Sequence, residues 1–303
     1  MSERPSAISH QPSGETLGAD ERGRSEGVRI AFIAAMEREV APLIRGWKVG
    51  GIVCDGRQYR IFESDDAVLI CGGIGAQAAR RAAEAVIQEV RPAQVISVGF
   101  AGGLDLKLKV ADVIEPRLVV NWADGSRTET GLGQGTLVSF GGVADAKQKE
   151  RLAKAYGADA VDMEAAAVAQ AAQVRGIGFA ALKAISDTVD FAMPPTEKFV
   201  SGRGEFRSAA FALHVAMRPW LWRSTITLSR NSARASRALC TAIEAYLSRN
   251  SGSAFKSSDD RQSTETGQTD PGGASHPITP TACVTETANW VGHDQDFRAV
   301  EKR

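Results

Sequence analysis

Between residues 28 and 187, short apolar runs alternate with segments in which apolar residues recur at helical spacing. The apolar runs predict strands at 28–35, 58–64, 67–73, 93–103, 111–120, 136–140, 159–163 and 178–187. The helical segments are 37–47, 76–90, 146–156 and 164–176, and we expect 146–156 to be an exposed helix. Strands that alternate with helices and are apolar on both faces predict an α/β fold, a three-layer αβα sandwich with a mixed central sheet.

Polar segments flank this patterned region. Residues 1–27 and 250–303 are rich in Ser, Gly and charged residues, and we expect both tails to be disordered because they cannot bury enough apolar area. The predicted folded domain is therefore 28–249. The first tail contains no apolar core of a signal peptide.

Composition narrows the class of protein. Lys and Arg together number 36, as do Asp and Glu, so net charge gives no attraction toward nucleic acid or an anionic membrane. No apolar run approaches the roughly 18 residues that span a bilayer. The four cysteines form no CxxC pair, which is typical of free thiols, so we expect a cytoplasmic protein.

Polar and glycine residues gather where predicted strands end, and this is where such folds bind ligands. These segments are Met36–Glu39, Gly72–Gly75, Gly99–Gly103, Asp162–Glu164 and Ser186–Asp187. Each has a plain structural interpretation: a first-turn acid, a tight turn or a cap. Together they favour one site, because a glycine loop opening a helix offers free N–H groups and the carboxylates can converge. Cleavage of a glycosidic bond uses such a set: an acid for the leaving group, a base for water and an acceptor for ribose hydroxyls.

Five of these motifs, in order, carry a family resemblance. AAMEREV, GGIGAQAA, SVGFAGGLDLKLKVADVI, AVDMEAAAVAQAA and AISDTVD resemble motifs of the nucleoside phosphorylase family, most closely its 5′-methylthioadenosine/S-adenosylhomocysteine nucleosidase branch. The resemblance implies cleavage of the N-glycosidic bond of a 5′-substituted adenosine, without metal or cofactor, in a homodimer with no nucleic-acid partner. Hydrolysis is favoured over phosphorolysis.

The resemblance also implies residue roles. Asp187 would protonate the departing purine, Glu39 would orient the attacking water, and Glu164 would bind the ribose hydroxyls. An aspartic acid of ordinary pKa is ionised at neutral pH, so proton donation by Asp187 needs a raised pKa or a proton drawn in with the substrate. The other substrate-binding candidates are Met163, Ser186, Ile74, Gly75, Ala101 and Phe140, and the phosphate candidates are Arg38 and Gly73.

Two departures from the nucleosidase branch leave alternatives open. The segment that normally supplies an aromatic residue against adenine is short, so Phe140 is its candidate here. The chain after Asp187 is long and aromatic, and resembles the hopanoid-associated phosphorylase branch, which acts on an adenosylated lipid. The plain interpretation is a pair of helices packed on the sheet or a dimer partner; the alternative is an apolar channel for a long 5′-substituent. Arg38 leaves phosphorolysis of adenosylhopane or another purine nucleoside open, and a non-catalytic nucleoside-binding protein is the third hypothesis.

Overall fold

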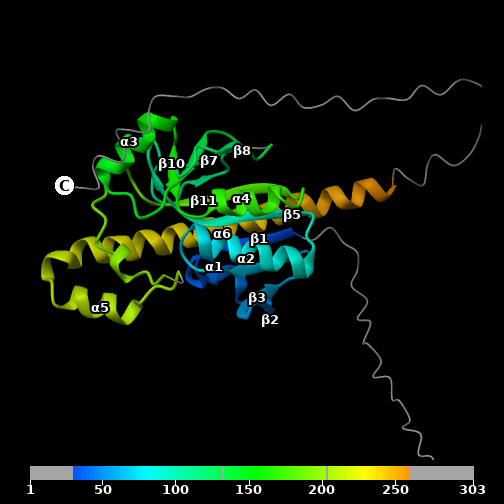
Figure 1. Cartoon of the computed structure of the whole chain (residues 1–303), viewed down its shortest axis with the longest axis horizontal. Coiled ribbons are helices and arrows are strands. Elements are labelled where there is room, and N and C mark those ends of the chain that lie inside the picture. The colour runs from blue at the N-terminus through cyan, green and yellow to red at the C-terminus, as the bar shows by residue number, and fades with distance from the viewer. Residues whose placement is uncertain (1–29, 132, 203, 260–303) are drawn as a thin grey trace, which may run out of the picture. The chain divides into compact units, whose positions relative to one another are not determined.

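The computed structural model describes residues 30–131, 133–202 and 204–259 (Figure 1). The described residues up to Ser257 belong to one compact unit. The predicted N-terminal tail, 1–27, lies outside the described residues. Of the predicted C-terminal tail, 250–259 continue the long helix α6 (Pro219–Asp259), and 260–303 lie outside the described residues.

Eleven described strands form one mixed sheet. They are β1 (Ile30–Ala34), β2 (Lys48–Cys54), β3 (Arg57–Glu63), β4 (Ala67–Cys71), β5 (Gln94–Gly103), β6 (Val113–Ile114), β7 (Leu118–Asn121), β8 (Arg127–Glu129), β9 (Thr136–Ser139), β10 (Ala160–Asp162) and β11 (Gly178–Asp187). The main order is β2-β3-β4-β1-β5-β10-β9-β7-β8. The sheet branches at β5, which pairs in parallel with β1 and along its length with β11, and antiparallel with β10 at its last residues.

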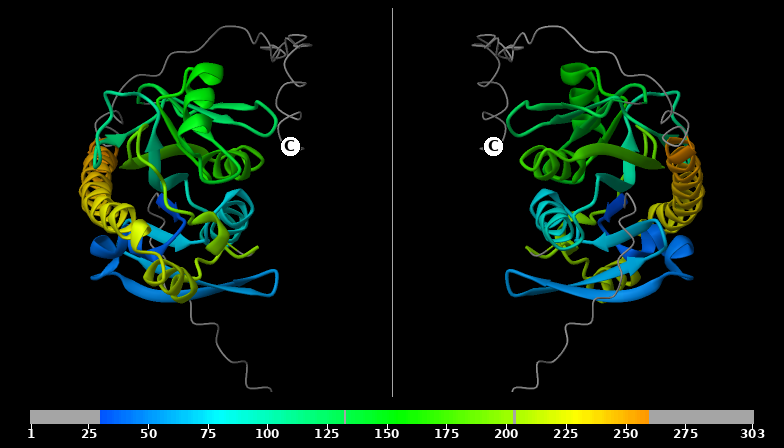
Figure 2. Two further views of the ribbon diagram at one scale, coloured as in Figure 1. Left: turned by 90° about the vertical axis from the view of Figure 1, so that its left-hand side faces the viewer. Right: turned by 90° about the vertical axis from the view of Figure 1, so that its right-hand side faces the viewer.

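Helices cover both faces of the sheet (Figure 2). Besides α6 they are α1 (Glu37–Ile44), α2 (Ala76–Val90), α3 (Ala146–Tyr156), α4 (Ala165–Gln173) and α5 (Ser208–Ala216), with a short 3₁₀ helix at Glu197–Phe199. The small inward residues of α2 and α4 form one core layer with the sheet. On the opposite face, α1 and the middle of α6 pack through residues such as Val40 and Leu239. This confirms the three-layer α/β prediction.

The structure departs from the predicted elements in three places. The single strand predicted at 111–120 is divided into β6 and β7, which flank Pro116, a residue with no N–H for a ladder bond. The strands β2 and β8 were not predicted. The helix α3 is not wholly exposed, because Leu152 and even Lys149 are buried. No helix in the described part of the chain combines the length and apolar character that crossing a bilayer requires.

Candidate active site

A pocket opens where β1, β5, β10 and β11 end, and most of the predicted site residues line it. Eight of the eleven candidates are among its lining residues: Arg38, Glu39, Ile74, Ala101, Met163, Glu164, Ser186 and Asp187. The three carboxyl groups singled out by the motifs, from widely separated parts of the chain, thus share one cavity.

Glu164 sits at the turn from β10 into α4 and is held by the glycine loop. The Gly75 N–H, at the start of α2, donates to Glu164 Oε1 at 2.8 Å. Gly75 has a positive φ of 94°, a backbone conformation that favours glycine, so the residue type fixes the direction of this N–H. Desolvation raises the pKa of Glu164 to about 7, with a further rise from the neighbouring Asp162 carboxylate and an opposing effect from Lys183.

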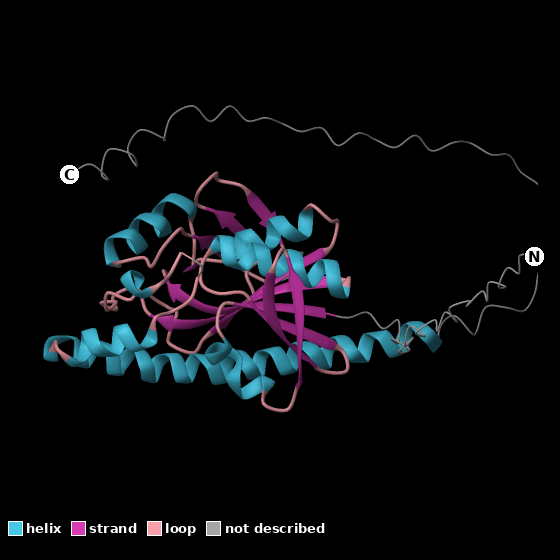
Figure 3. Ribbon diagram, turned by 60° about the horizontal axis from the view of Figure 1, so that its bottom comes forward, coloured by secondary structure: helices cyan, strands magenta, loops and turns pink. Residues whose placement is uncertain are grey.

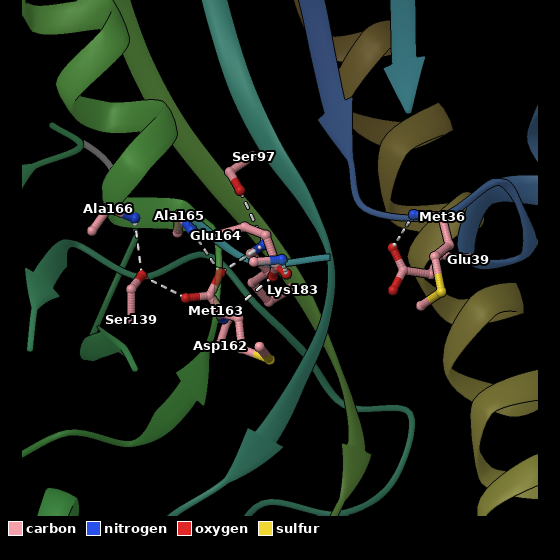
Figure 4. Close-up of polar contacts among 11 residues, drawn as sticks. Met36, Glu39, Ser97, Ser139, Asp162, Met163, Glu164, Ala165, Ala166 and Lys183 are labelled. Atoms are coloured by element: carbon pink, nitrogen blue, oxygen red, sulfur yellow. Dashed lines mark hydrogen bonds and ion pairs between the residues drawn. The ribbon is translucent and has the colours of Figure 1, made fainter. Parts of the chain in front are cut away.

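A buried ion pair lies directly behind Glu164 (Figure 4). Lys183 Nζ on β11 lies 2.9 Å from Asp162 Oδ2 and donates to Ser97 Oγ at 3.0 Å. Ser139 Oγ donates to Asp162 Oδ1, and the Ala165 N–H at the start of α4 donates to Oδ2. Burial opposes the charge of Lys183, but Asp162, Glu164 and Glu39 together raise the pKa of its ammonium group. The surrounding carboxylates therefore hold Lys183 as an ammonium group, and its charge is balanced by Asp162 in the pair.

Glu39 projects from the first turn of α1 and is 3% exposed. Its Oε2 accepts a hydrogen bond from the Met36 N–H at 3.3 Å (Figure 4). Desolvation raises the pKa of Glu39, against smaller lowering effects of Lys183 and the Met36 N–H. A carboxylate with a raised pKa is a better proton acceptor at neutral pH, as a base for water must be.

Asp187 ends β11 with a partner that the sequence did not predict. Lys149 Nζ, from α3, donates to Asp187 Oδ2 at 2.5 Å and to the Thr188 carbonyl at 2.7 Å. Ser186 Oγ donates to Asp187 Oδ1 at 2.6 Å. Both carboxylate oxygens are thus acceptors, and the ammonium group of Lys149 is a proton donor in direct contact with Asp187.

Two glycines of β5 make room for these acidic groups. A Cβ on Gly99, where φ is 146°, would lie 3.1 Å from Glu39 Oε2. A Cβ on Gly102 would lie 3.1 Å from both Asp187 Oδ2 and Lys149 Cε. The close approach of these acidic side chains to β5 therefore favours glycine at positions 99 and 102.

Three candidates do not line the pocket. Gly73 donates its N–H to the Ala35 carbonyl, and Gly75 reaches the site only through Glu164. Phe140 packs edge-to-face on Trp122, with ring centroids 4.8 Å apart, and Gly142 and Val143 of the following loop line the pocket instead.

Sequence reasoning missed Lys149 and Lys183 and treated Asp162 only as a strand-end acid. Lys183 is the one charged residue between Gly178 and Ser186, in a strand otherwise buried almost throughout, and this isolation was a usable signal. The sequence signal for Lys149 was weaker. Lys149 lies three residues before the buried Leu152, on the same face of α3.

The segment after Asp187 supplies another wall of the pocket. Met193, Val200, Phe206 and Leu228 line it with apolar atoms, and Ser232 of α6 adds a hydroxyl. Arg38 Cζ lies 5.2 Å from the centre of the Phe206 ring, a cation–π distance, so this arginine is stacked at the pocket wall.

Comparison of the sequence with known families shows the family to which this chain belongs. The model of the phosphorylase superfamily matches residues 29–147 and 132–216, and the chain belongs to that superfamily. Similar curated proteins are 5′-methylthioadenosine/S-adenosylhomocysteine nucleosidases. The one from Actinobacillus succinogenes is 27% identical over 207 residues, which cover 54% of this chain and 87% of the relative. The one from Marinomonas sp. is 35% identical over 101 residues, which cover 30% of this chain and only 41% of the relative.

Solved structures support the fold at lower identity. A 5′-methylthioadenosine nucleosidase from Arabidopsis thaliana is 19% identical, with a TM-score of 0.56 over 73% of this chain and 96% of that one. An S-adenosylhomocysteine nucleosidase from Streptococcus pyogenes, in complex with 5-methylthiotubericidin, is 18% identical, with a TM-score of 0.55 over 74% and 98%. At this level of identity, the similarities establish the fold alone.

Proposed function

We propose that the protein hydrolyses the N-glycosidic bond of a 5′-substituted adenosine and releases adenine. The observation that carries this proposal is the shared pocket of Glu39, Glu164 and Asp187. The matched nucleosidases support the class of substrate. A homodimeric state, a cytoplasmic location and a part in methionine salvage are further predictions of the same resemblance.

The proposed reaction uses each group in turn. Glu164 accepts hydrogen bonds from the ribose hydroxyls, and its negative charge stabilises the oxocarbenium-like sugar as the bond to the purine breaks. The electron pair of that bond goes to the purine, whose ring nitrogen takes a proton from Asp187. Water adds to the sugar carbon and gives its proton to Glu39.

The contact between Lys149 and Asp187 supports a route by which Asp187 donates a proton at neutral pH. Because both oxygens of Asp187 already accept hydrogen bonds, the carboxylate must gain a proton before it can give one. We propose that Lys149 supplies it: the Nζ–H proton moves to Oδ2 as Asp187 protonates the leaving purine. Solvent then restores the ammonium group.

The direct test is base release by the purified full chain. Methylthioadenosine, S-adenosylhomocysteine, adenosine and inosine would each be supplied with and without inorganic phosphate, and products separated by chromatography. We expect free adenine and free sugar from the 5′-thio substrates, at the same rate with and without phosphate. Tight binding of these nucleosides without base release would instead identify a binding protein.

A second candidate function rests on the wall built by the long C-terminal segment. Arg38 could face a phosphate nucleophile, and the apolar side chains of Met193, Val200, Phe206 and Leu228 would suit a long 5′-substituent such as that of adenosylhopane. A sugar 1-phosphate formed only with phosphate, from a nucleoside carrying an alkyl chain, would establish this function in place of hydrolysis.

A further inference from the structure

The hairpin of α5 and α6 carries a concentrated exposed apolar surface. Nine large apolar side chains are exposed among the described residues, and five of them lie between positions 213 and 226. They are Leu213, Met217, Trp220, Trp222 and Ile226, with exposures from 49% to 73%. The helix α5 buries none of its residues, so this stretch is not packed on the sheet. The five side chains, with the arginines described next, are called the α5–α6 surface below.

The charged residues of α5 and of the first part of α6, up to Ile243, have one sign. From Ser208 to Ile243 the chain has no Asp or Glu. Arg223, Arg230 and Arg237 recur every seventh residue of α6 and so share one helix face, and Arg234 lies beside them; all four are exposed. Across the described residues none of these four pairs with a carboxylate. The balanced charge of the whole chain therefore conceals a local basic stripe.

The arginine face points away from the body of the protein. The opposite face of α6 lines the pocket through Leu228 and Ser232 and then enters the core through Ala235 and Leu239. Figures 1 and 3 show the hairpin of α5 and the start of α6 extending past the ends of the strands. The tryptophans and arginines are thus presented outward together.

An apolar surface of this kind can be covered by a second copy of the chain or by a lipid bilayer. The charge of the surface distinguishes these two alternatives. In a symmetric dimer the same surface meets itself, which would bring arginines toward arginines with no acid between Ser208 and Ile243 to compensate. An anionic bilayer supplies the missing negative charge. Tryptophan favours the head-group level, and arginine side chains reach lipid phosphates while their methylene stems lie on apolar material.

We propose that the α5–α6 surface docks peripherally on an anionic lipid bilayer. The tryptophan, methionine and leucine side chains enter the head-group region, and the arginine stripe contacts lipid phosphates. Because Leu228 of α6 and Phe206, which lies just before α5, line the pocket, docking places the pocket beside the lipid surface.

The test is co-sedimentation of the full chain with vesicles. The vesicles would be phosphatidylcholine alone or phosphatidylcholine with phosphatidylglycerol. We expect binding to the anionic vesicles, weakened when salt rises from ~0.1 M to ~0.5 M as the surface charges are screened. The paired variant M217S/W220S removes exposed side chains, and R230Q/R237Q removes two charges of the stripe. Each should weaken vesicle binding by at least ~10-fold.

Matched controls change the same residue types elsewhere. V49S/V53S alters exposed apolar side chains of β2, and R81Q/R151Q alters exposed arginines of α2 and α3. Both should bind vesicles as the wild type does. Equal binding by M217S/W220S and the wild type, or no preference for anionic vesicles, would overturn the proposal. So would a drop in solution mass on M217S/W220S substitution, since the surface would then join two copies.

Discussion

At the scale of single residues, the three carboxyl groups of the pocket differ in their hydrogen-bond and ion-pair partners. Glu39 is buried and accepts a hydrogen bond from the Met36 N–H, Glu164 is held by a glycine N–H, and Asp187 is paired with a lysine. Different surroundings separate the proton affinities of chemically similar groups. These differences suit the proposed roles of base, hydroxyl acceptor and acid within one cavity.

The raised pKa of Glu164 predicts a pH-dependent stability. Because the pKa rises from 4.5 to about 7 on folding, its contribution to folding is most favourable below pH 4.5 and is lost as pH rises through 7. Glu164→Gln mimics the protonated form and keeps an oxygen for the Gly75 N–H. We expect E164Q to melt above the wild type at pH 8, with a much smaller difference at pH 5, by differential scanning fluorimetry. The exposed control E129Q should show no such change, and an E164Q difference independent of pH would contradict the assignment.

At the scale of elements, the site is a junction of strand ends that helices complete from outside. The helix α2 orients Glu164 through Gly75, α1 carries Glu39, and α3 reaches across to the end of β11 through Lys149. The prediction that α3 is exposed is wrong at Lys149 and Leu152. The sequence pattern cannot distinguish a solvated lysine from a buried lysine that is paired with a carboxylate. The glycines of β5 were predictable as site features, but the atoms they accommodate were not.

The contact between α3 and β11 predicts a selective loss of activity. Lys149→Met removes the proposed proton source, so kcat for adenine release should fall by about 10²-fold. A 4-nitrophenyl glycoside of the same 5′-substituted ribose needs no protonation of its leaving group, so its cleavage should change only a few-fold. Retained cleavage also shows that K149M is folded. Lys154→Met, at an exposed lysine five residues further along α3, is the control. Equal losses on both substrates would assign Lys149 a purely structural role.

At the scale of the whole molecule, the sequence predicted the parts of the fold that depend on apolar pattern. Buried strands such as 93–103 and 178–187 were found, since both of their faces are apolar. The exposed hairpin strand β2 was not, because its residues lack the alternation expected of a half-buried strand. The branching of the sheet at β5 depends on long-range pairing that no local pattern encodes. The candidate site was found by its order of motifs, whereas the lysines that set its charge became visible only in three dimensions.

The distribution of charged residues along the whole sequence explains how a chain with no net charge can have a strongly basic segment. The sequence has no Asp or Glu between Glu205 and Glu244. Local charge, not the total, governs association with a surface, because screening limits the reach of exposed charges to about 8–10 Å at moderate salt. The basic character of the α5–α6 surface therefore depends on where the arginines lie, and the total composition does not reveal it.

The proposal that three carboxyl groups of one pocket act on one sugar is best tested by substitution of Asp187. Asp187→Asn would be compared with Asp190→Asn, an exposed neighbour outside the pocket, in adenine release from methylthioadenosine without phosphate. We expect a loss of at least ~10²-fold in kcat for D187N and a rate within a few-fold of wild type for D190N. Adenine release by D187N at the wild-type rate would contradict it.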